Sequence, residues 1–112
     1  MSTKYHGFAN KETSVMWDFI CNHDRVQSRW LKRADTYRKG AVADATWTAS
    51  ENAAFLLRDR LKEVFQEDMA EALDDLKRSN YVPAWVEWVS EFITDSFAEV
   101  NWLEIARNLL DE

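Results

Sequence analysis

The sequence has little of what disulfides, tight turns and strand connections require. Its 112 residues include one cysteine, one proline and two glycines. The single cysteine, Cys21, cannot form a disulfide within the chain, so we expect a reducing cytoplasm as its location. The scarcity of turn residues argues against a meander of short strands, which needs a turn about every eight to twelve residues.

The sequence also predicts neither a targeting segment nor a membrane-spanning segment. Its start, MSTKYHGF, does not combine a basic segment with an apolar run, so we predict no signal peptide. The apolar runs are far shorter than the roughly 20 residues of a spanning helix. We therefore expect that the protein does not bind a membrane.

Apolar and aromatic residues are abundant. They include six Trp and six Phe within an apolar fraction of 46%, which predicts an aromatic-rich core, and the length suits one domain over residues 1–112. Apolar residues recur at helical spacing over residues 10–22, 24–40, 49–77, 83–98 and 101–110. The third segment either continues or breaks at Gln66-Glu67-Asp68. We therefore predict an all-α, single-domain bundle of five or six helices.

Polar residues stand where several of these helices should begin. Asn10 is a good N-cap, with Glu12 in the following turn. Gly7 permits a tight approach to that cap, and Tyr5 and Phe8 can fold back on the first turn. Further helix starts are predicted at Asp24, at the capping box Thr48-Ala-Ser-Glu51 and at Asn101, which Glu104 follows.

The apolar pattern also predicts which surfaces face the core. The predicted core face of the first helix consists of Val15, Met16, Phe19, Ile20 and His23. Segment 83–98 is apolar over most of its circumference, so we expect it at the centre of the core. Trp85, Trp88 and Trp102 fit core positions.

Two motifs at the ends of the chain resemble a known family. The first is Tyr5-x-Gly7-Phe8-x-Asn10-x-Glu12-Thr13, and the second is Val100-Asn101-Trp102-x-Glu104-Ile105-Ala106. Together they resemble the two ends of an uncharacterised family of small proteins from bacteriophages, plasmids and other mobile elements. That family has Trp where Phe8 and Ser14 stand, and an aromatic residue where Lys11 stands.

The resemblance implies a mobile-element origin, the cytoplasm of a bacterial host and a helical fold. It carries no established activity, so no catalytic residue can be assigned from it. Both motifs also make physical sense as helix entrances with an aromatic lock. The residues concerned are Tyr5, Gly7, Phe8, Asn10, Glu12 and Thr13 at one end and Asn101, Trp102 and Glu104 at the other.

The net charge of −6 is unevenly distributed. Residues 1–40 hold eight basic and four acidic residues, whereas residues 41–112 hold six and sixteen. The acidic excess includes a row at four-residue intervals: Asp59, Glu63, Glu67, Glu71 and Asp75. On a continuous helix these carboxylates lie about 6 Å apart along one ridge, a spacing similar to that of nucleic-acid phosphates. The row is either a surface for a basic partner or the solvated face of an amphipathic helix.

Basic residues concentrate in the second segment. Its outward positions hold Arg25, Arg29, Lys32 and Arg33, which could lie against phosphates. No aromatic interleaving or base-reading pattern accompanies them. The alternative is a surface helix whose charges face the acidic half of the same molecule or of a second copy, so a homodimer is left open.

No constellation in the sequence predicts catalysis or cofactor binding. Cys21 and His23 would point about 200° apart on a helix, and no second ligand pair accompanies them and Asp24. We interpret His23 as a partly buried residue at a helix end. No Gly-rich phosphate loop, Ser/His/Asp set or metal motif is visible. We expect a protein that is not an enzyme and uses no metal or cofactor.

These observations favour a non-enzymatic interaction protein of a phage or similar element. It would bind a host or phage protein with a basic surface stoichiometrically, as an inhibitor in host defence or host takeover does. The acidic row would form the contact, joined by Trp17 or Trp47 unless these two tryptophans pack under the connector. The alternative is a nucleic-acid-binding accessory protein that uses the basic second segment.

Overall fold

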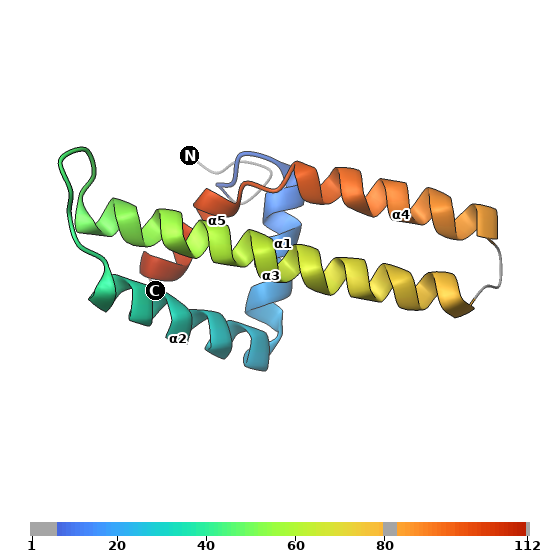
Figure 1. Cartoon of the computed structure of the whole chain (residues 1–112), viewed down its shortest axis with the longest axis horizontal. Helices are drawn as coiled ribbons and strands as arrows, with labels where there is room; N and C mark the ends of the chain where they lie inside the picture. The colour runs from blue at the N-terminus through green and yellow to red at the C-terminus, as the bar shows by residue number, and fades with distance from the viewer. Residues whose placement is uncertain (1–6, 80–82, 112) are drawn as a thin grey trace.

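Five helices make up the part of the chain that the computed structural model describes, residues 7–79 and 83–111. They are α1 (Lys11–Asn22), α2 (Asp24–Gly40), α3 (Ala49–Ser79), α4 (Pro83–Ala98) and α5 (Trp102–Asp111) (Figure 1). These ranges contain no strand. The predicted all-α class is confirmed. The described ranges contain five helices, the smaller of the two predicted numbers.

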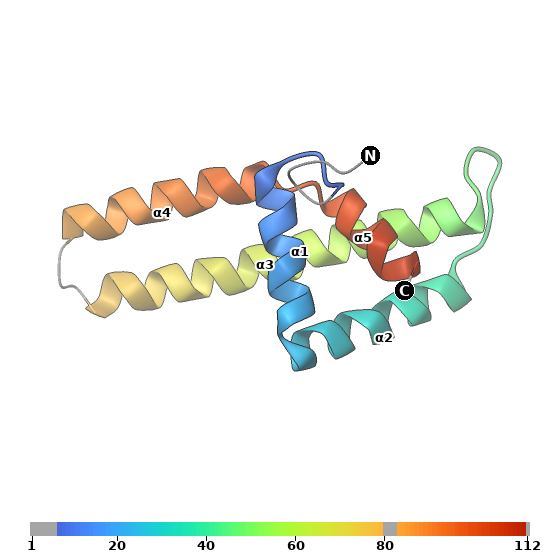
Figure 2. The same cartoon turned by 180° about the vertical axis from the view of Figure 1, so that it is seen from behind.

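The helix α3 organises the molecule. It runs without interruption for 31 residues, so the break allowed at residues 66–68 does not occur and the helix is about 46 Å long at 1.5 Å per residue. Helices α2 and α5 pack along its first half, α1 crosses it near the middle, and α4 runs beside its second half (Figures 1 and 2). The molecule is correspondingly long, 51 × 33 × 29 Å.

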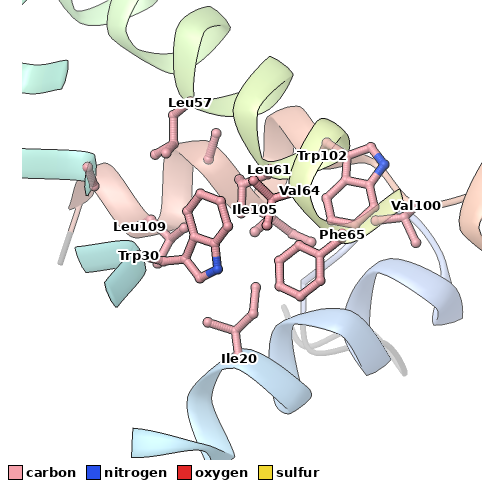
Figure 3. Packing of buried hydrophobic residues seen from close by; sticks show 12 residues of the cluster. Ile20, Trp30, Leu57, Leu61, Val64, Phe65, Val100, Trp102, Ile105 and Leu109 are labelled. Carbon is pink, nitrogen blue, oxygen red and sulfur yellow. The ribbon is translucent and has the colours of Figure 1, made fainter. Parts of the chain in front are cut away.

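The core lies where the first half of α3 meets α2, α5 and α1 (Figure 3). Its centre is a row of three aromatic rings, in which Phe65 stacks on Trp30 at 5.7 Å and on Trp102 at 5.6 Å between centroids. Aliphatic side chains from three helices close around the row: Ile20, Leu57, Leu61, Ile105 and Leu109, each at most 1% exposed. Burial of this kind contributes roughly 2 kcal/mol per large side chain, so the inner end of α3 is the stable end.

The core-facing side of α1 differs from the prediction. Ile20 is buried as expected, but Val15 is 57% exposed and Phe19 is 42% exposed. Thr13 and Ser14 are buried instead. The reason is that α1 crosses α3 rather than lying along it, so a single stripe cannot stay in contact over the whole helix.

Two helix starts also differ in detail. His23, not Asp24, is the N-cap of α2, and its side chain makes no capping hydrogen bond. His23 is exposed, so its predicted partial burial is wrong. At the start of α3, Thr48 Oγ1 accepts from the backbone N–H of Glu51 at 3.1 Å and donates to Glu51 Oε1 at 3.0 Å. The carboxylate therefore reaches the threonine hydroxyl rather than the backbone N–H that a full capping box uses.

The helix α4 lies outside the core, contrary to the prediction. Trp88 is 56% exposed and Phe92 is 63% exposed, while the side chain of Trp85 lies outside the described residues. Because α3 extends beyond α1, α2 and α5, α4 has one long neighbour (Figure 1). Among the described side chains of α4, Phe97 near its C-terminal end packs against the core, with its ring centroid 6.1 Å from that of Trp102. The radius of gyration, 16.1 Å, accordingly exceeds the roughly 13 Å of a typical chain of about this length.

Candidate functional site

The two terminal motifs both cap helices, as predicted. Asn10 Oδ1 accepts from the backbone N–H of Thr13 at 2.9 Å and from its hydroxyl at 2.6 Å. Asn101 Oδ1 accepts from the backbone N–H of Glu104 at 3.2 Å. These bonds satisfy backbone donors that a helix start otherwise leaves unpaired.

The same motifs also join the two ends of the chain, which their sequence does not reveal. The backbone N–H of Ala9 donates to Glu104 Oε1 at 3.0 Å, and that of Asn101 donates to Thr13 Oγ1 at 2.8 Å. Asn10 contributes a third link, from Nδ2 to the carbonyl of Glu99 at 2.7 Å. A motif that reads as two separate helix entrances is therefore one clamp between α1 and α5.

Aromatic packing completes this clamp. Phe8 is buried and lies 6.0 Å from the half-buried ring of Trp17. Gly7 adopts φ +91°, a left-handed conformation that glycine accepts most readily. Trp102 is in the core, whereas Tyr5 lies outside the described residues. Glu12 is half-buried in the first turn of α1. The described motif residues thus have structural roles in this fold.

The predicted acidic row is exposed along α3, but basic neighbours neutralise part of it. The ion pairs are Arg58–Asp59 at 2.8 Å, Arg60–Glu63 at 2.6 Å and Arg78–Asp75 at 3.4 Å. Glu67 and Glu71 form no ion pair with any described residue. The row is therefore not an even field of negative charge, and its unneutralised members lie at the middle of α3 and beyond.

A larger acidic surface appears when α3 and α4 are considered together. We call residues 67–79 of α3 and residues 83–98 of α4 the outer hairpin. It carries eight acidic and two basic residues, a net charge of −6. Helix α4 has no basic residue, and its three carboxylates, Glu87, Glu91 and Asp95, are all exposed. The structure thus adds α4 to the acidic surface that the sequence assigned to α3 alone.

An exposed apolar surface adjoins these carboxylates. On α4, the rings of Trp88 and Phe92 stack with centroids 5.9 Å apart. Phe92 and Val15 line one hollow of about 300 Å³ between α4 and α1. Val15 and Phe19 line a second hollow of about 450 Å³ that is floored by side chains of α2 and α3. We call this continuous surface the apolar trough.

The apolar trough was not predicted from the sequence, although one feature of the sequence indicates it. Segment 83–98 is apolar around most of its circumference, and such a helix needs neighbours on several sides to be buried. The structure provides one long neighbour, α3. Part of the apolar surface of α4 is therefore left exposed.

The predicted basic side chains share one face of α2, on which Arg25, Arg29 and Lys32 are exposed and Arg33 is half-buried. Arg25, Arg29, Lys32 and Arg33 line an open depression, and none of the four forms an ion pair with a described residue. Arg29 and Arg33 also lie over the ring of Trp30, at 5.9 and 5.7 Å from its centroid. By contrast, Arg38 and Lys39 both pair with Asp35, and the hydrogen bond from Lys39 lowers the pKa of that carboxyl.

The connector between α2 and α3 packs on itself. Asp44 Oδ1 accepts from the backbone N–H groups of Thr46 at 2.8 Å and Trp47 at 2.7 Å. These hydrogen bonds lower the pKa of the Asp44 carboxyl, and the bond from Trp47 has the larger effect. Trp47 remains 44% exposed while its ring meets Phe55 edge-on at 5.0 Å. The contact with Phe55 of α3 thus covers part of the Trp47 ring.

The candidate ligands Cys21, His23 and Asp24 are not gathered into a site. His23 Nδ1 lies 2.7 Å from the carbonyl of Phe19, and the two rings are 4.5 Å apart. Across the described ranges, no cluster of three or more His, Cys, Asp or Glu side chains could hold a metal ion. The same ranges contain no helix with the length and apolarity to cross a bilayer.

Comparisons of the chain with models of protein families, with curated proteins and with solved structures found no match.

Proposed function

We propose that the protein acts by stoichiometric binding to another protein, through its outer hairpin. The observation that carries the proposal is the exposure of α4. Its Trp88 and Phe92 are more than half exposed. Trp88 lines a depression with the three carboxylates of α4 and one basic residue, Lys77 of α3, so acidic residues predominate there. Exposed aromatic residues are enriched at protein interfaces, and clustered charge guides association. A partner with both basic and apolar surface fits this chemistry.

In this proposal the protein is not an enzyme, and it works in the cytoplasm of a bacterial host. The resemblance of its terminal motifs to a family from phages and plasmids supports that setting. Inhibition of a host or phage protein is then the role that binding would serve. The acidic row of α3 contributes through Glu67 and Glu71, which belong to the outer hairpin.

The proposal is tested by recovering the tagged protein from bacterial cells together with bound proteins. An outer variant, Glu87→Gln with Glu91→Gln and Asp95→Asn, is compared with an inner variant, Asp59→Asn with Glu63→Gln. We expect the original protein and the inner variant to retain the same basic partner and the outer variant to lose it. Retention by the outer variant, or loss by the inner one alone, contradicts the assignment to the outer hairpin.

A second candidate function is nucleic-acid binding by α2. It is favoured by the four basic side chains that have no ion-pair partner among the described residues and line one open depression. Gel shifts at two salt concentrations decide it, because phosphate contacts weaken steeply as salt rises. Binding at low salt that is lost in the double variant Arg25→Ala, Lys32→Ala would support it. These positions are chosen because both are exposed and neither contacts the Trp30 ring.

A further inference from the structure

We propose that the apolar trough receives an amphipathic helix of the partner protein, with basic residues flanking its apolar stripe. This inference rests on the proposed function and deepens it, since it names the segment of the partner and where it lies. The docked helix lies beside α1, across the outer hairpin.

The first support is that the trough is hollow and continuous. Its two hollows share the side chains of Val15, Met16 and Phe97, so they form one depression that passes from α4 along α1 towards α2. Trp88 extends the surface further along α4 through its stacking with Phe92. The exposed parts of Val15, Phe19, Trp88 and Phe92 amount to roughly 400 Å², which is within the range of the largest apolar patch on a typical monomer, a patch that is often functional.

The second support is the helical spacing of the trough walls. Val15 and Phe19 on α1 are four residues apart, as are Trp88 and Phe92 on α4. Rows at this spacing form ridges between which the side chains of another helix fit. Figure 2 shows α1 passing in front of α3, and among the described helices none covers the same face of the outer hairpin further out. A partner helix would occupy the position next to α1.

The third support is charge, which favours a basic partner over a second copy of the chain. The charged residues that line the two hollows are two of each sign: Lys11, Arg29, Glu12 and Asp68. At Trp88 the surface adjoins a depression lined by Glu87, Glu91 and Asp95 and by one basic residue, Lys77 of α3. A symmetric pair of copies joined through this side of α4 would bring the three carboxylates of each copy together. Like charges brought together in this way oppose association. A helix with Lys or Arg beside its apolar stripe meets the same carboxylates favourably, as in other helix-in-groove complexes.

The test uses a labelled synthetic peptide of about 18 residues, with Leu at positions i, i+3, i+4 and i+7 and Lys elsewhere. Two matched peptides serve as controls: one has the same composition in scrambled order, and the other has Glu in place of Lys. Binding to the full chain is measured by fluorescence anisotropy. We expect the patterned Lys peptide to bind at least about 10-fold more tightly than either control, because both the stripe and the charge are needed.

The location is tested with Phe92→Ser and Val15→Ser, and the control variant is Val42→Ser, on the connector and 74% exposed. Each trough variant should weaken peptide binding about 10-fold, whereas the control should leave it unchanged. All three positions are exposed, and circular dichroism checks that each variant keeps its helices.

Several results would overturn the inference. They are an absence of patterned-peptide binding at roughly 100 µM, equal binding of the scrambled peptide, and unchanged binding by the trough variants. Dimerisation in sedimentation experiments that Phe92→Ser abolishes would assign the trough to a second copy instead. If the outer variant still loses its cellular partner while the peptide result is negative, only the docked helix is excluded. If the outer variant retains that partner, the proposed function itself fails.

Discussion

Thr13 is fully buried although its side chain is polar. Its hydroxyl donates to Asn10 Oδ1 and accepts from the backbone N–H of Asn101, so both of its hydrogen-bonding capacities are used. Buried polar groups are tolerated when they are paired in this way. One hydroxyl thus links the start of α1 to the start of α5.

Replacing Thr13 with Val should destabilise the fold by about 1–3 kcal/mol. The change keeps the shape of the side chain but leaves the N–H of Asn101 without its acceptor. Urea unfolding measures the effect. The matched control is Thr36→Val, because the hydroxyl of Thr36 is exposed and bonds only to the carbonyl of Lys32. A loss equal to that of the control would mean that the buried link contributes nothing.

The lowered pKa of Asp44 leads to a prediction about pH. Its pKa is lowered because its ionised carboxylate accepts backbone bonds from Trp47 and Thr46. A lowered pKa means that the stabilising charge is fully present at neutral pH and is lost as pH falls through that lowered value. NMR titration should therefore show the amides of residues 46 and 47 shifting with a midpoint below the ordinary Asp value. In Asp44→Asn this acid transition should disappear; its persistence would assign the transition to another group.

At the scale of elements, α3 is one continuous helix with two different environments. Its first half is enclosed, with Leu57 and Leu61 at 0% exposure, whereas Leu76 near its end is 41% exposed. A regular apolar period along the sequence cannot distinguish these halves, because the period states only that one face is apolar. What covers the face is decided by the other helices.

The two halves should respond differently to the same substitution. Leu61→Ala should cost about 2–5 kcal/mol, because it removes enclosed side-chain atoms and leaves a cavity. Leu76→Ala should cost less than about 1 kcal/mol, since water already reaches that side chain. Chemical denaturation of both variants measures the difference. Equal losses would show that the outer half of α3 is enclosed in solution.

The whole molecule has opposite charge at two places and unequal packing along its length. Helix α2 has six basic and two acidic residues, whereas the outer hairpin has a net charge of −6. The aromatic core lies at the end that α2 and α5 enclose, and the outer hairpin extends away from it (Figure 1). The aromatic core and the acidic outer hairpin are therefore separated along α3.

Hydrogen exchange should detect this separation. We expect the amides of residues 57–65 to exchange only on global unfolding, and those of residues 68–78 and 88–95 to exchange at least about 10-fold faster through partial opening. The reason is that none of the described side chains of the outer hairpin is fully buried. Binding of the patterned peptide should slow exchange there. Equal protection over the whole of α3 would contradict a partial opening.

Much of the fold follows from local sequence. Asn10 and Asn101 begin their helices as expected, because a cap depends on a side chain and backbone donors a few residues away. The uninterrupted run without Gly or Pro over residues 49–79 likewise makes one long helix possible. The face of α1 could not be predicted in the same way, since it depends on the crossing with α3.

The all-α class, most of the helix starts and the uneven distribution of charge are predictable from the amino-acid sequence, because each follows from neighbouring residues or from composition. The links that Thr13 and Glu104 make between the two ends of the chain, and the position of α4 at the edge with Phe92 exposed, depend on how the helices pack. Burial depends on how many neighbours a helix has. That number is set by the length of α3 relative to the other helices, and no local pattern contains it.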